Sequence, residues 1–242
     1  MEYELIGRAV HVWPVSIQAP DSTVESFRRL LAPDETERAA RFRFEHLRSS
    51  FILARGALRI LLGRYLKSPP QDLTFSYGSK GKPTLRRPAS LQFNASHSGD
   101  LALFAFTMDC EIGVDVEAIR PMPDSEDIAK RFFCAEETAE LMSLPSGQRD
   151  RSFFLCWTRK EAYIKATGEG LSAPLDAFRV TLRPGEPARI IHLAGDPTAA
   201  QSWTLHDLAP GPGFAGALAY QEPPRPLELF TPVNPKQLLE LT

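Results

Sequence analysis

The scarcity of cysteines and of long apolar segments limits the classes of protein to which this chain can belong. Its three cysteines, Cys110, Cys134 and Cys156, form no C-x-x-C pair and lie in no cysteine or histidine cluster. This spacing predicts free thiols in a reducing compartment rather than a disulfide framework or a zinc site. No stretch approaches about 18 uninterrupted apolar residues, so no membrane span is predicted. The acidic start, MEYELIGRAV, lacks the apolar run of a signal peptide, and we therefore expect a cytoplasmic protein with no membrane partner.

The chain also lacks a strong excess of charge of either sign. Its 28 basic and 30 acidic residues give a formal net charge of -2, which does not favour a protein that binds nucleic acid. Basic residues nevertheless outnumber acidic ones between Arg28 and Lys67. This local excess suits an anionic ligand, although a solvated helix face gives the same pattern. An RNA-binding module built on this stretch is an alternative that the absence of an RNP-type aromatic motif disfavours.

Helical and strand patterns follow each other twice along the chain, whose composition of 43% hydrophobic and 24% charged residues is typical of globular proteins. In the first half, we expect a strand at 9–15, a helix at 32–66, and strands at 73–77, 91–93 and 101–106. In the second half, we expect a strand at 112–117, helices at 125–144 and 151–167, and strands at 178–182, 189–192, 203–207 and 214–220.

This order, a helix followed by several strands and then repeated, predicts an α+β fold made of two similar halves in one chain. The expected halves are residues 1–108 and 109–222, although no residue-level repeat is visible between them. The Pro-rich segment that begins with PPRP, residues 223–242, is expected to be a peripheral tail.

The strand pattern IGVDVE, Ile112–Glu117, carries two carboxylates on one face. Side chains alternate along a strand, so Asp115 and Glu117 lie side by side, and Gly113 leaves room on the same face. Two neighbouring carboxylates repel each other unless a cation or solvent separates them, and oxygen ligands of this kind suit Mg²⁺. The alternative is a solvated strand face.

The helical stretch FLCWTRKEAYIKATGEGL, which begins at Phe154, ends in two glycines and carries a row of residues spaced by four. Phe153, Trp157, Glu161 and Lys165 share one face of this helix, which is aromatic at one end and charged at the other. This pattern predicts that Glu161 lies at the rim of the core. The alternative is an ordinary surface pair of Glu161 and Lys165.

A polar loop, Asn94–Asp100, is expected between two strands, and it contains Ser96 and His97. A protonated histidine beside hydroxyls and open backbone amides would bind phosphate, whereas the alternative is a hairpin turn whose serines bond to their own backbone. A hydrolase is disfavoured, because there is no G-x-S-x-G motif and no residue assigned to orient His97. A second turn, SKGKPTL at Ser79–Leu85, carries Lys80 and Lys82.

Four segments in this order resemble the surfactin-type 4'-phosphopantetheinyl transferases. They are GKP at Gly81–Pro83, FNASHSG at Phe93–Gly99, IGVDVE at Ile112–Glu117 and WTRKEAYIKATGEGL at Trp157–Leu171. IAKRFFCAEE, Ile128–Glu137, also resembles a segment of this family. The resemblance covers roughly residues 33 to 178.

The resemblance implies an enzyme that transfers the 4'-phosphopantetheine group of coenzyme A to a serine of an apo acyl or peptidyl carrier protein and releases 3',5'-ADP. It implies two pseudo-twofold-related α+β halves, and Mg²⁺ held by Asp115, Glu117 and Glu161. Lys165 would contact the phosphate that is attacked, and Lys160 would lie close by. Either Glu161 or a metal-bound water would act as the base.

The resemblance also implies the side chains that hold coenzyme A. Ser96, His97 and Lys82 would contact its phosphates. Arg38 matches a basic position that reaches the nucleotide 3'-phosphate. Some members carry a basic residue just before the apolar part of the helix, where this chain has Ser50, so the nucleotide ligand can be Arg38, Arg48 or Arg55.

A carrier protein would need an apolar docking surface, for which the segment Arg131–Leu144 is the candidate; the alternative is that these residues are core. Carriers of fatty-acid, polyketide and nonribosomal-peptide synthesis all fit. Because one chain supplies both halves, we expect a monomer. The main alternative function is a protein that binds coenzyme A or another nucleotide without transferase activity.

Overall fold

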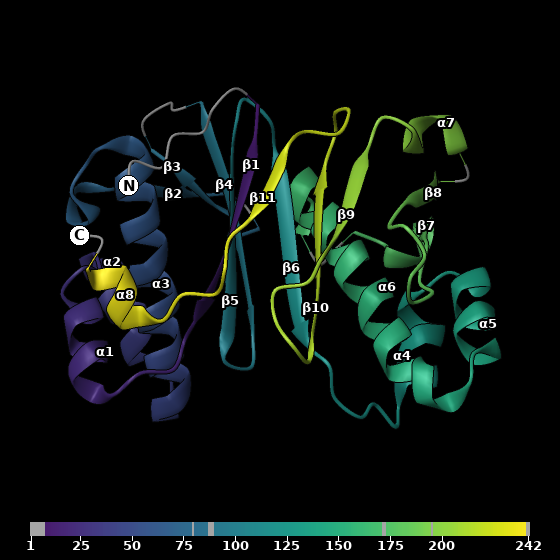
Figure 1. Ribbon diagram of the computed structural model, residues 1–242, viewed down its shortest axis with the longest axis horizontal. Coiled ribbons are helices and arrows are strands. Elements are labelled where there is room, and N and C mark those ends of the chain that lie inside the picture. The colour runs from purple at the N-terminus through teal and green to yellow at the C-terminus, as the bar shows by residue number, and fades with distance from the viewer. Residues whose placement is uncertain (1–7, 79, 87–89, 171–172, 195, 241–242) are drawn as a thin grey trace.

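The computed structural model describes residues 8–78, 80–86, 90–170, 173–194 and 196–240, and it has two α+β halves side by side (Figure 1). Helices lie on the two outer sides of the molecule and strands lie between them. The predicted α+β class is thus confirmed. Ser79 and Leu171, each at one end of a predicted motif, lie outside the described residues.

The first half builds a sheet with strand order β11-β1-β5-β4, in which the last strand along the chain lies at one edge. Its strands are mainly antiparallel, and helices cover the outer face. The elements are β1 (Val10–Ser16), α1 (Asp21–Arg28), α2 (Pro33–Ala40), α3 (Glu45–Leu66), the 3₁₀ helix η1 (Pro70–Asp72), β2 (Phe75–Tyr77), β3 (Pro83–Leu85), β4 (Leu91–Ser98) and β5 (Leu101–Met108).

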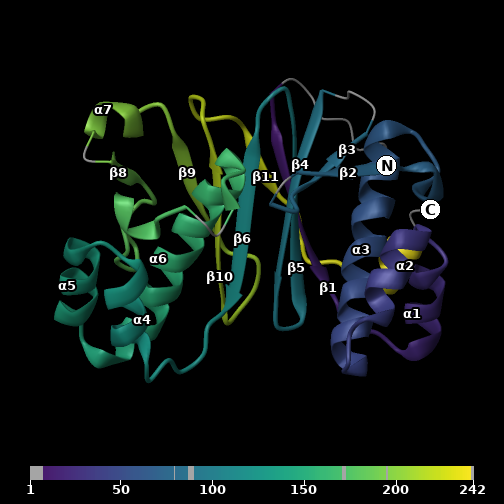
Figure 2. The ribbon, with the colours of Figure 1, turned by 180° about the vertical axis from the view of Figure 1, so that it is seen from behind.

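The second half builds an antiparallel sheet with strand order β6-β10-β9. Helices again cover its outer face, as Figure 2 shows from behind. The elements are β6 (Ile112–Ala118), α4 (Ser125–Phe132), α5 (Ala135–Ser143), α6 (Ser146–Thr167), the 3₁₀ helix η3 (Leu175–Ala177), β7 (Phe178–Val180), β8 (Ile190–Leu193), α7 (Pro197–Ala200), β9 (Thr204–Leu208) and β10 (Phe214–Tyr220).

Two of the predicted helices are divided. The helix expected at 32–66 breaks between α2 and α3, where Phe44 is extended and precedes a new helix. The break lets α2 fold back, so that Glu35 of α2 pairs with Arg59 of α3. The helix expected at 125–144 breaks in the same way at Phe133, which is also extended. In contrast, α6 begins at Ser146, several residues before the predicted start.

The structure corrects the prediction that residues 223–242 form a peripheral tail. Strand β11 (Leu227–Leu229) pairs in parallel with β1, and Phe230 stacks on Trp13 with ring centroids 3.8 Å apart. Helix α8 (Pro235–Leu239) packs on α3 and buries Leu238 completely. The segment completes the first half because β1 needs a hydrogen-bonding neighbour and Trp13 needs apolar cover.

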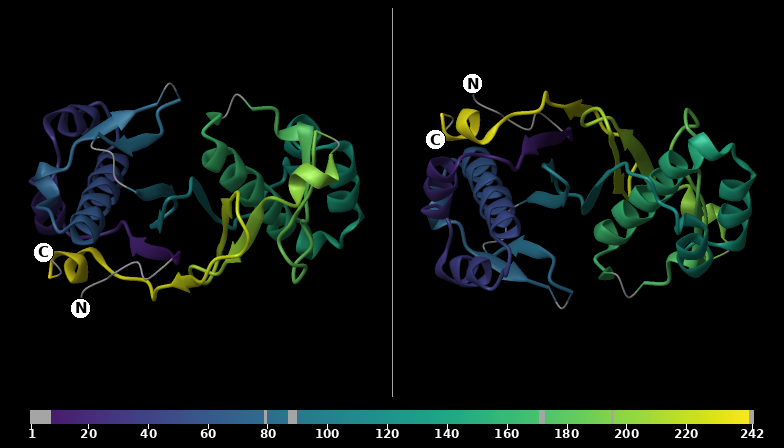
Figure 3. Two further views of the ribbon diagram at one scale, coloured as in Figure 1. Left: turned by 90° about the horizontal axis from the view of Figure 1, so that it is seen from above. Right: turned by 90° about the horizontal axis from the view of Figure 1, so that it is seen from below.

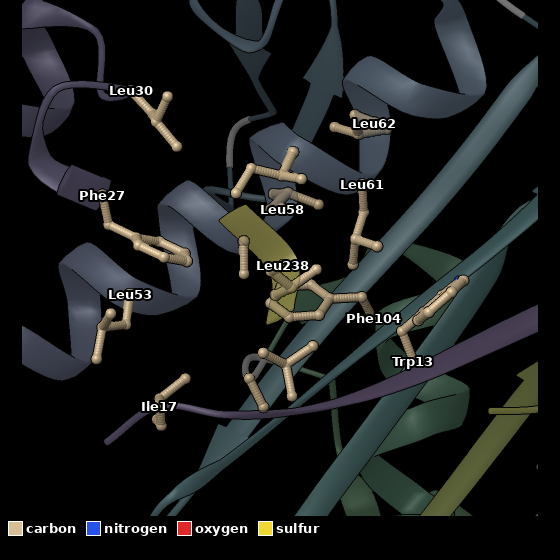
Figure 4. Packing of buried hydrophobic residues seen from close by; sticks show 14 of the residues in the cluster. Trp13, Ile17, Phe27, Leu30, Leu53, Leu58, Leu61, Leu62, Phe104 and Leu238 are labelled. Atoms are coloured by element: carbon tan, nitrogen blue, oxygen red, sulfur yellow. The ribbon is translucent and has the colours of Figure 1, made fainter. Parts of the chain in front are cut away.

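Apolar side chains form one core in each half and a third core between the two sheets. Figure 4 shows part of the first core, where α3 contributes Leu53, Leu58, Leu61 and Leu62 and the C-terminal segment contributes Leu238. The third core includes Val114 and Val116, so one face of β6 faces the first half. Within the described ranges, no helix is long and apolar enough to cross a membrane.

The two halves are also joined by polar contacts between β4 and β6. The Asn94 Oδ1 atom accepts a hydrogen bond from the Val114 N–H over 3.0 Å, and the Ser98 hydroxyl accepts one from the Ala118 N–H over 3.1 Å. Figure 3 shows the two halves from above and from below, with the strands meeting along this junction. The junction therefore places the polar side chains of β4 beside the carboxylates of β6.

Candidate active site

The position of the site depends on a very close approach between β6 and α6 at Gly113. A Cβ atom at Gly113 would lie 2.0 Å from the carbonyl oxygen of Ala162 and 2.4 Å from the nitrogen of Ala166, so only glycine fits. The room expected beside Gly113 is thus occupied by the backbone of α6. This contact brings the charged end of α6 beside the two carboxylates of β6.

The three predicted carboxylates line one pocket. Asp115 and Glu161 are buried, and Glu117 is partly buried. The Asp115 Oδ2 and Glu161 Oε1 atoms are inaccessible to solvent and find no hydrogen-bond donor among the described residues. Buried carboxylate oxygens without a donor are costly, and a bound cation would offset that cost.

Lys165 connects α6 to both neighbouring strands. Its Nζ atom lies 2.6 Å from the Asp115 Oδ1 atom and donates to the Ser96 hydroxyl over 2.9 Å. The Ser96 hydroxyl in turn donates to the same Asp115 oxygen over 2.7 Å. Farther along β6, the Ser98 hydroxyl donates to Glu117 over 2.7 Å. The strands and the helix therefore hold the charged groups in one hydrogen-bonded arrangement.

The carboxylates have altered acidity because they are buried close together. Burial, and then the charge of Asp115, raises the pKa of Glu161 to about 7, against the opposing effect of Lys165. Burial also raises the pKa of Glu117, and the nearby Asp115 adds to this effect despite the hydrogen bond from Ser98. Burial and mutual repulsion therefore disfavour the ionised form of Glu161 and Glu117 even with Lys165 present.

The donor set fits a divalent cation. No group of three histidine, cysteine, aspartate or glutamate side chains in the described ranges is gathered closely enough to hold a metal directly. However, Asp115, Glu117 and Glu161 share one pocket, and two of them present unpartnered buried oxygens. Mg²⁺ commonly takes one or two carboxylates and completes its shell with water and phosphate, so these residues can hold it together with an anionic ligand.

Residues 94–98 form the end of β4 rather than the predicted loop, and the turn is made by Gly99 and Asp100. Side chains alternate along the strand, so Asn94, Ser96 and Ser98 face β6. Sequence reasoning missed Asn94 and counted Ser98 only among the hydroxyls of the loop; reading this segment as a strand would have found both on the face of Ser96.

His97 lies on the pocket wall. Burial of its ring lowers the pKa of His97, and the charge of the Lys165 ammonium lowers it further. The neutral ring is therefore favoured in the free protein, whereas a bound phosphate would favour the protonated ring that the sequence predicted.

The turn between β2 and β3 forms the opposite wall. The Nζ atom of Lys82 lies 2.7 Å from Glu111 and donates to the carbonyl oxygen of Lys165 over 2.9 Å. The side chain of Lys82 therefore joins the β2–β3 turn of the first half to the end of α6 in the second half. The whole pocket measures about 500 Å³ and is lined by Lys80, Gly81, Lys82, Pro83, Asn94, Ala95, Ser96, His97, Asp115, Glu117, Trp157, Glu161, Ile164, Lys165, Gly168 and Gly170.

The structure corrects the prediction for Lys160. Its ammonium is fully buried in the second half, 2.8 Å from Glu137, and donates to the carbonyl oxygens of Leu175 and Phe178. Lys160 therefore does not line the pocket. Adjacent helix positions lie about 100° apart, so Lys160 faces the core side when Glu161 faces the pocket.

The three candidate arginines have different surroundings. Arg38 lines a second hollow of about 640 Å³, which shares Gly81 with the first pocket and also contains Arg41, a residue that the sequence did not single out. Arg48 is paired with Glu45 at 2.6 Å. Arg55 is ion-paired with Glu35 and packs on Phe75. Arg38 is thus the candidate whose side chain lies at an open cavity.

The segment proposed for carrier docking, Arg131–Leu144, divides into two groups. Phe133 and Leu141 are buried in the second core, which favours the core alternative for them. Phe132 and Met142 are partly buried. The docking surface therefore stays a prediction for the accessible part of this segment alone.

Comparisons with known proteins find two matching families. The model described as the 4'-phosphopantetheinyl transferase superfamily matches residues 111–219, and the one described as 4'-phosphopantetheinyl transferase, N-terminal, matches residues 18–109. The chain is 40% identical to 4'-phosphopantetheinyl transferase HetI of Nostoc sp. over 218 residues, which are 89% of each chain.

Two Bacillus proteins are also similar. The identity to 4'-phosphopantetheinyl transferase Sfp of Bacillus subtilis is 34%, over 65% of this chain and 69% of that protein. The identity to 4'-phosphopantetheinyl transferase psf-1 of Bacillus pumilus is 32%, over 72% of this chain and 73% of that protein. The residues matched by the two family models include the strands and the helix that form the pocket.

Proposed function

The chain belongs to the 4'-phosphopantetheinyl transferase superfamily, and on this basis we propose that it transfers the 4'-phosphopantetheine group of coenzyme A to a serine of an apo carrier protein. The enzyme class is supported by several relatives over most of the chain, which disfavours a protein that only binds coenzyme A. The observation that carries the finer proposal is the pair of unpartnered oxygens, Asp115 Oδ2 and Glu161 Oε1, in a pocket ringed by lysines.

Asp115, Glu117 and Glu161 would hold Mg²⁺, which would neutralise the pyrophosphate of coenzyme A and complete its shell with water. Lys165 would donate to the phosphate that is attacked. Lys82, Ser96 and His97 would bind other phosphate oxygens, and Arg38 in the adjoining hollow would reach the nucleotide 3'-phosphate.

The reaction forms one bond and breaks one bond. The hydroxyl oxygen of the carrier serine attacks the phosphorus that carries the pantetheine group, and the bond from that phosphorus to the bridging oxygen breaks. The electron pair of the broken bond leaves with 3',5'-ADP, whose phosphate becomes the new anionic end. Either Glu161 or a metal-bound water would accept the serine proton. The pKa of about 7 that burial gives Glu161 belongs to the metal-free pocket, and a bound cation would lower it.

A mass measurement tests the proposal. The purified chain is incubated with coenzyme A, Mg²⁺ and an apo carrier, and the carrier is then weighed. We expect a gain of one phosphopantetheine group that depends on Mg²⁺, and an unchanged mass with Asp115→Ala. A carrier that stays unmodified by the wild type, across acyl and peptidyl carriers, would contradict the proposal.

Fatty-acid, polyketide and nonribosomal-peptide carriers all present a serine at the start of a helix. The same panel would show which of them the enzyme modifies and would thereby identify the pathway.

We further propose that a single chain is sufficient, because β4, β6 and α6 of one chain line the pocket. We also propose a cytoplasmic location and no role for nucleic acid. Light scattering during turnover would measure the mass of the active species and would test whether it is a monomer.

A further inference from the structure

Each half contains a buried glutamate at the same place in a short helix. Glu35 is the third residue of α2, and Glu137 is the third residue of α5. Each carboxylate accepts a hydrogen bond from the backbone N–H of the residue that precedes its helix, over 2.8 Å from Ala32 and 3.0 Å from Cys134. Both glutamates are at most 2% exposed, so each requires a buried cationic partner.

In the first half, the fully buried partner is Arg59 of α3, and the more exposed Arg55 pairs with the other oxygen of Glu35. The Nε atom of Arg59 lies 2.6 Å from Glu35, and its Nη1 atom donates to the carbonyl oxygens of Pro70 and Leu73 over 2.8 and 3.1 Å. Pro70 begins the 3₁₀ helix η1, and Leu73 follows its end. The guanidinium also lies over the ring of Phe75, at the start of β2.

In the second half, the partner is Lys160 of α6. Its ammonium lies 2.8 Å from Glu137 and donates to the carbonyl oxygens of Leu175 and Phe178 over 2.7 and 2.6 Å. Leu175 begins the 3₁₀ helix η3, and Phe178 follows its end. The ammonium also lies over the ring of Phe178, at the start of β7. The three N–H donors of Lys160 thus have three acceptors.

The backbone held by each cation lies next to a wall of the pocket. In the first half, the chain continues from Leu73 through β2 to Lys80, which lines the pocket. In the second half, Gly168 and Gly170 line the pocket between the end of α6 and Leu175. The two walls touch, because a Cβ atom at Gly170 would lie 2.9 Å from the Cβ atom of Lys80.

We propose that the Glu35–Arg59 and Glu137–Lys160 pairs are equivalent positioning devices, which hold the two walls that meet across the pocket. The inference rests on the proposed function, since it assigns to these walls the binding of coenzyme A. Lys160 acts through Leu175 and α6, and it touches no substrate. A wall whose flanking backbone is fixed requires less ordering when an anionic ligand binds.

The test removes the second pair and leaves the site residues intact. The variant Glu137→Gln/Lys160→Met removes both buried charges at similar side-chain size, which avoids leaving one charge unpaired. Asp207→Asn is the matched control: it weakens the ion pair of Arg159, which is equally buried and lies beside Lys160 on α6, but which contacts β9 and Thr181 instead of the pocket wall.

Coenzyme A binding is measured by calorimetry, and KM and kcat are measured with an apo carrier. For the double variant, we expect Kd and KM for coenzyme A to rise about 10- to 100-fold, with kcat within about threefold of the wild type. For Asp207→Asn, we expect a lower Tm and an unchanged KM. A structural role alone would lower the Tm of both proteins and leave KM unchanged in both.

Two results would overturn the inference: a folded double variant with wild-type Kd, or a control that raises Kd equally. If the double variant does not fold, Glu137→Gln keeps an acceptor for Val180 but loses the charge and the second oxygen, which binds Lys160 and the Cys134 N–H. Its Kd is expected to rise about 3- to 10-fold. Failure of the proposed function would appear differently, as a wild type that binds coenzyme A but transfers nothing; the calorimetric comparison then still decides the inference.

Discussion

The long helices of the two halves, α3 and α6, share a framework but differ at the position that carries chemistry. Each has 22 residues and is followed by a residue with positive φ, Lys67 in one case and Gly168 in the other. Each also carries a buried cation that binds a glutamate and two backbone carbonyls. The next residue is Ile60 in α3, which is buried in the first core, and Glu161 in α6, which lines the pocket.

Both long helices support their half of the fold, whereas α6 also supplies a carboxylate to the pocket. Both halves retain the buried ion pair, because the polar atoms that it binds would otherwise be unsatisfied in either half. Only the second half places a carboxylate after the cation and a glycine where the strand crosses the helix. The first half instead contributes β4 and the β2–β3 turn, so the pocket combines two similar frameworks with unlike side chains.

The largest expected effect tests equivalent positions of the two helices. Glu161→Gln keeps the size of the side chain but removes a charge and a proton acceptor, so turnover should fall about 10²- to 10⁴-fold with little change in Tm. Ile60→Val should do the opposite, with unchanged turnover and a loss of about 0.5–1.5 kcal/mol of stability. Turnover assays at saturating Mg²⁺ and coenzyme A, paired with melting curves, check both. A Glu161→Gln protein with wild-type turnover would mean that α6 is only scaffold.

A second comparison concerns the glycines packed against other elements. Gly113→Ala should destabilise the protein by about 3 kcal/mol, because the new methyl group meets the backbone of α6. Gly56→Ala in α3 meets the ring of Phe27 at 2.6 Å, and a side chain can move more easily than a helix backbone, so we expect about 1 kcal/mol. Urea unfolding would measure both. Equal losses would contradict the special role of the contact between β6 and α6.

A third prediction concerns the pH dependence of stability in metal-free protein. Glu161 has a pKa of about 7 when folded, against 4.5 as its ordinary value, so the folded state binds more protons between these values. Stability should therefore decrease as pH rises from about 4.5 to 7, by about 1–3 kcal/mol. Glu161→Gln should flatten this slope, as should excess Mg²⁺. Urea titrations at several pH values would check it, and an identical slope in the variant would assign the effect to another group.

The smallest expected effect concerns the phosphate ligands of the first half. His97→Ala and Lys82→Ala should raise KM for coenzyme A about 5- to 10-fold and leave kcat nearly unchanged, since these contacts exist in both ground and transition states. Initial-rate kinetics with a carrier would measure this. A loss confined to kcat would instead place His97 in the chemical step, and the division of roles between the halves would be wrong.

The sequence by itself determined the parts of this protein that depend on short-range periodicity. Alternation along a strand placed Asp115 and Glu117 on one face, and spacing by four placed Glu161 above Lys165. The order of helices and strands indicated two α+β halves. These predictions needed only the geometry of single elements, which a local pattern specifies. The assigned roles of these residues stay predictions until the variants are measured.

Tertiary structure alone decided what depends on contacts between distant residues. It directed Lys160 to Glu137 instead of the pocket, engaged Arg55 with Glu35, and brought the C-terminal segment onto β1. It also revealed that the two halves carry equivalent buried ion pairs. The sequence does not show this repeat, because the cation is Arg59 in one half and Lys160 in the other. A buried charge must find a partner wherever packing offers one, and local spacing carries no information about partners that are distant in the sequence.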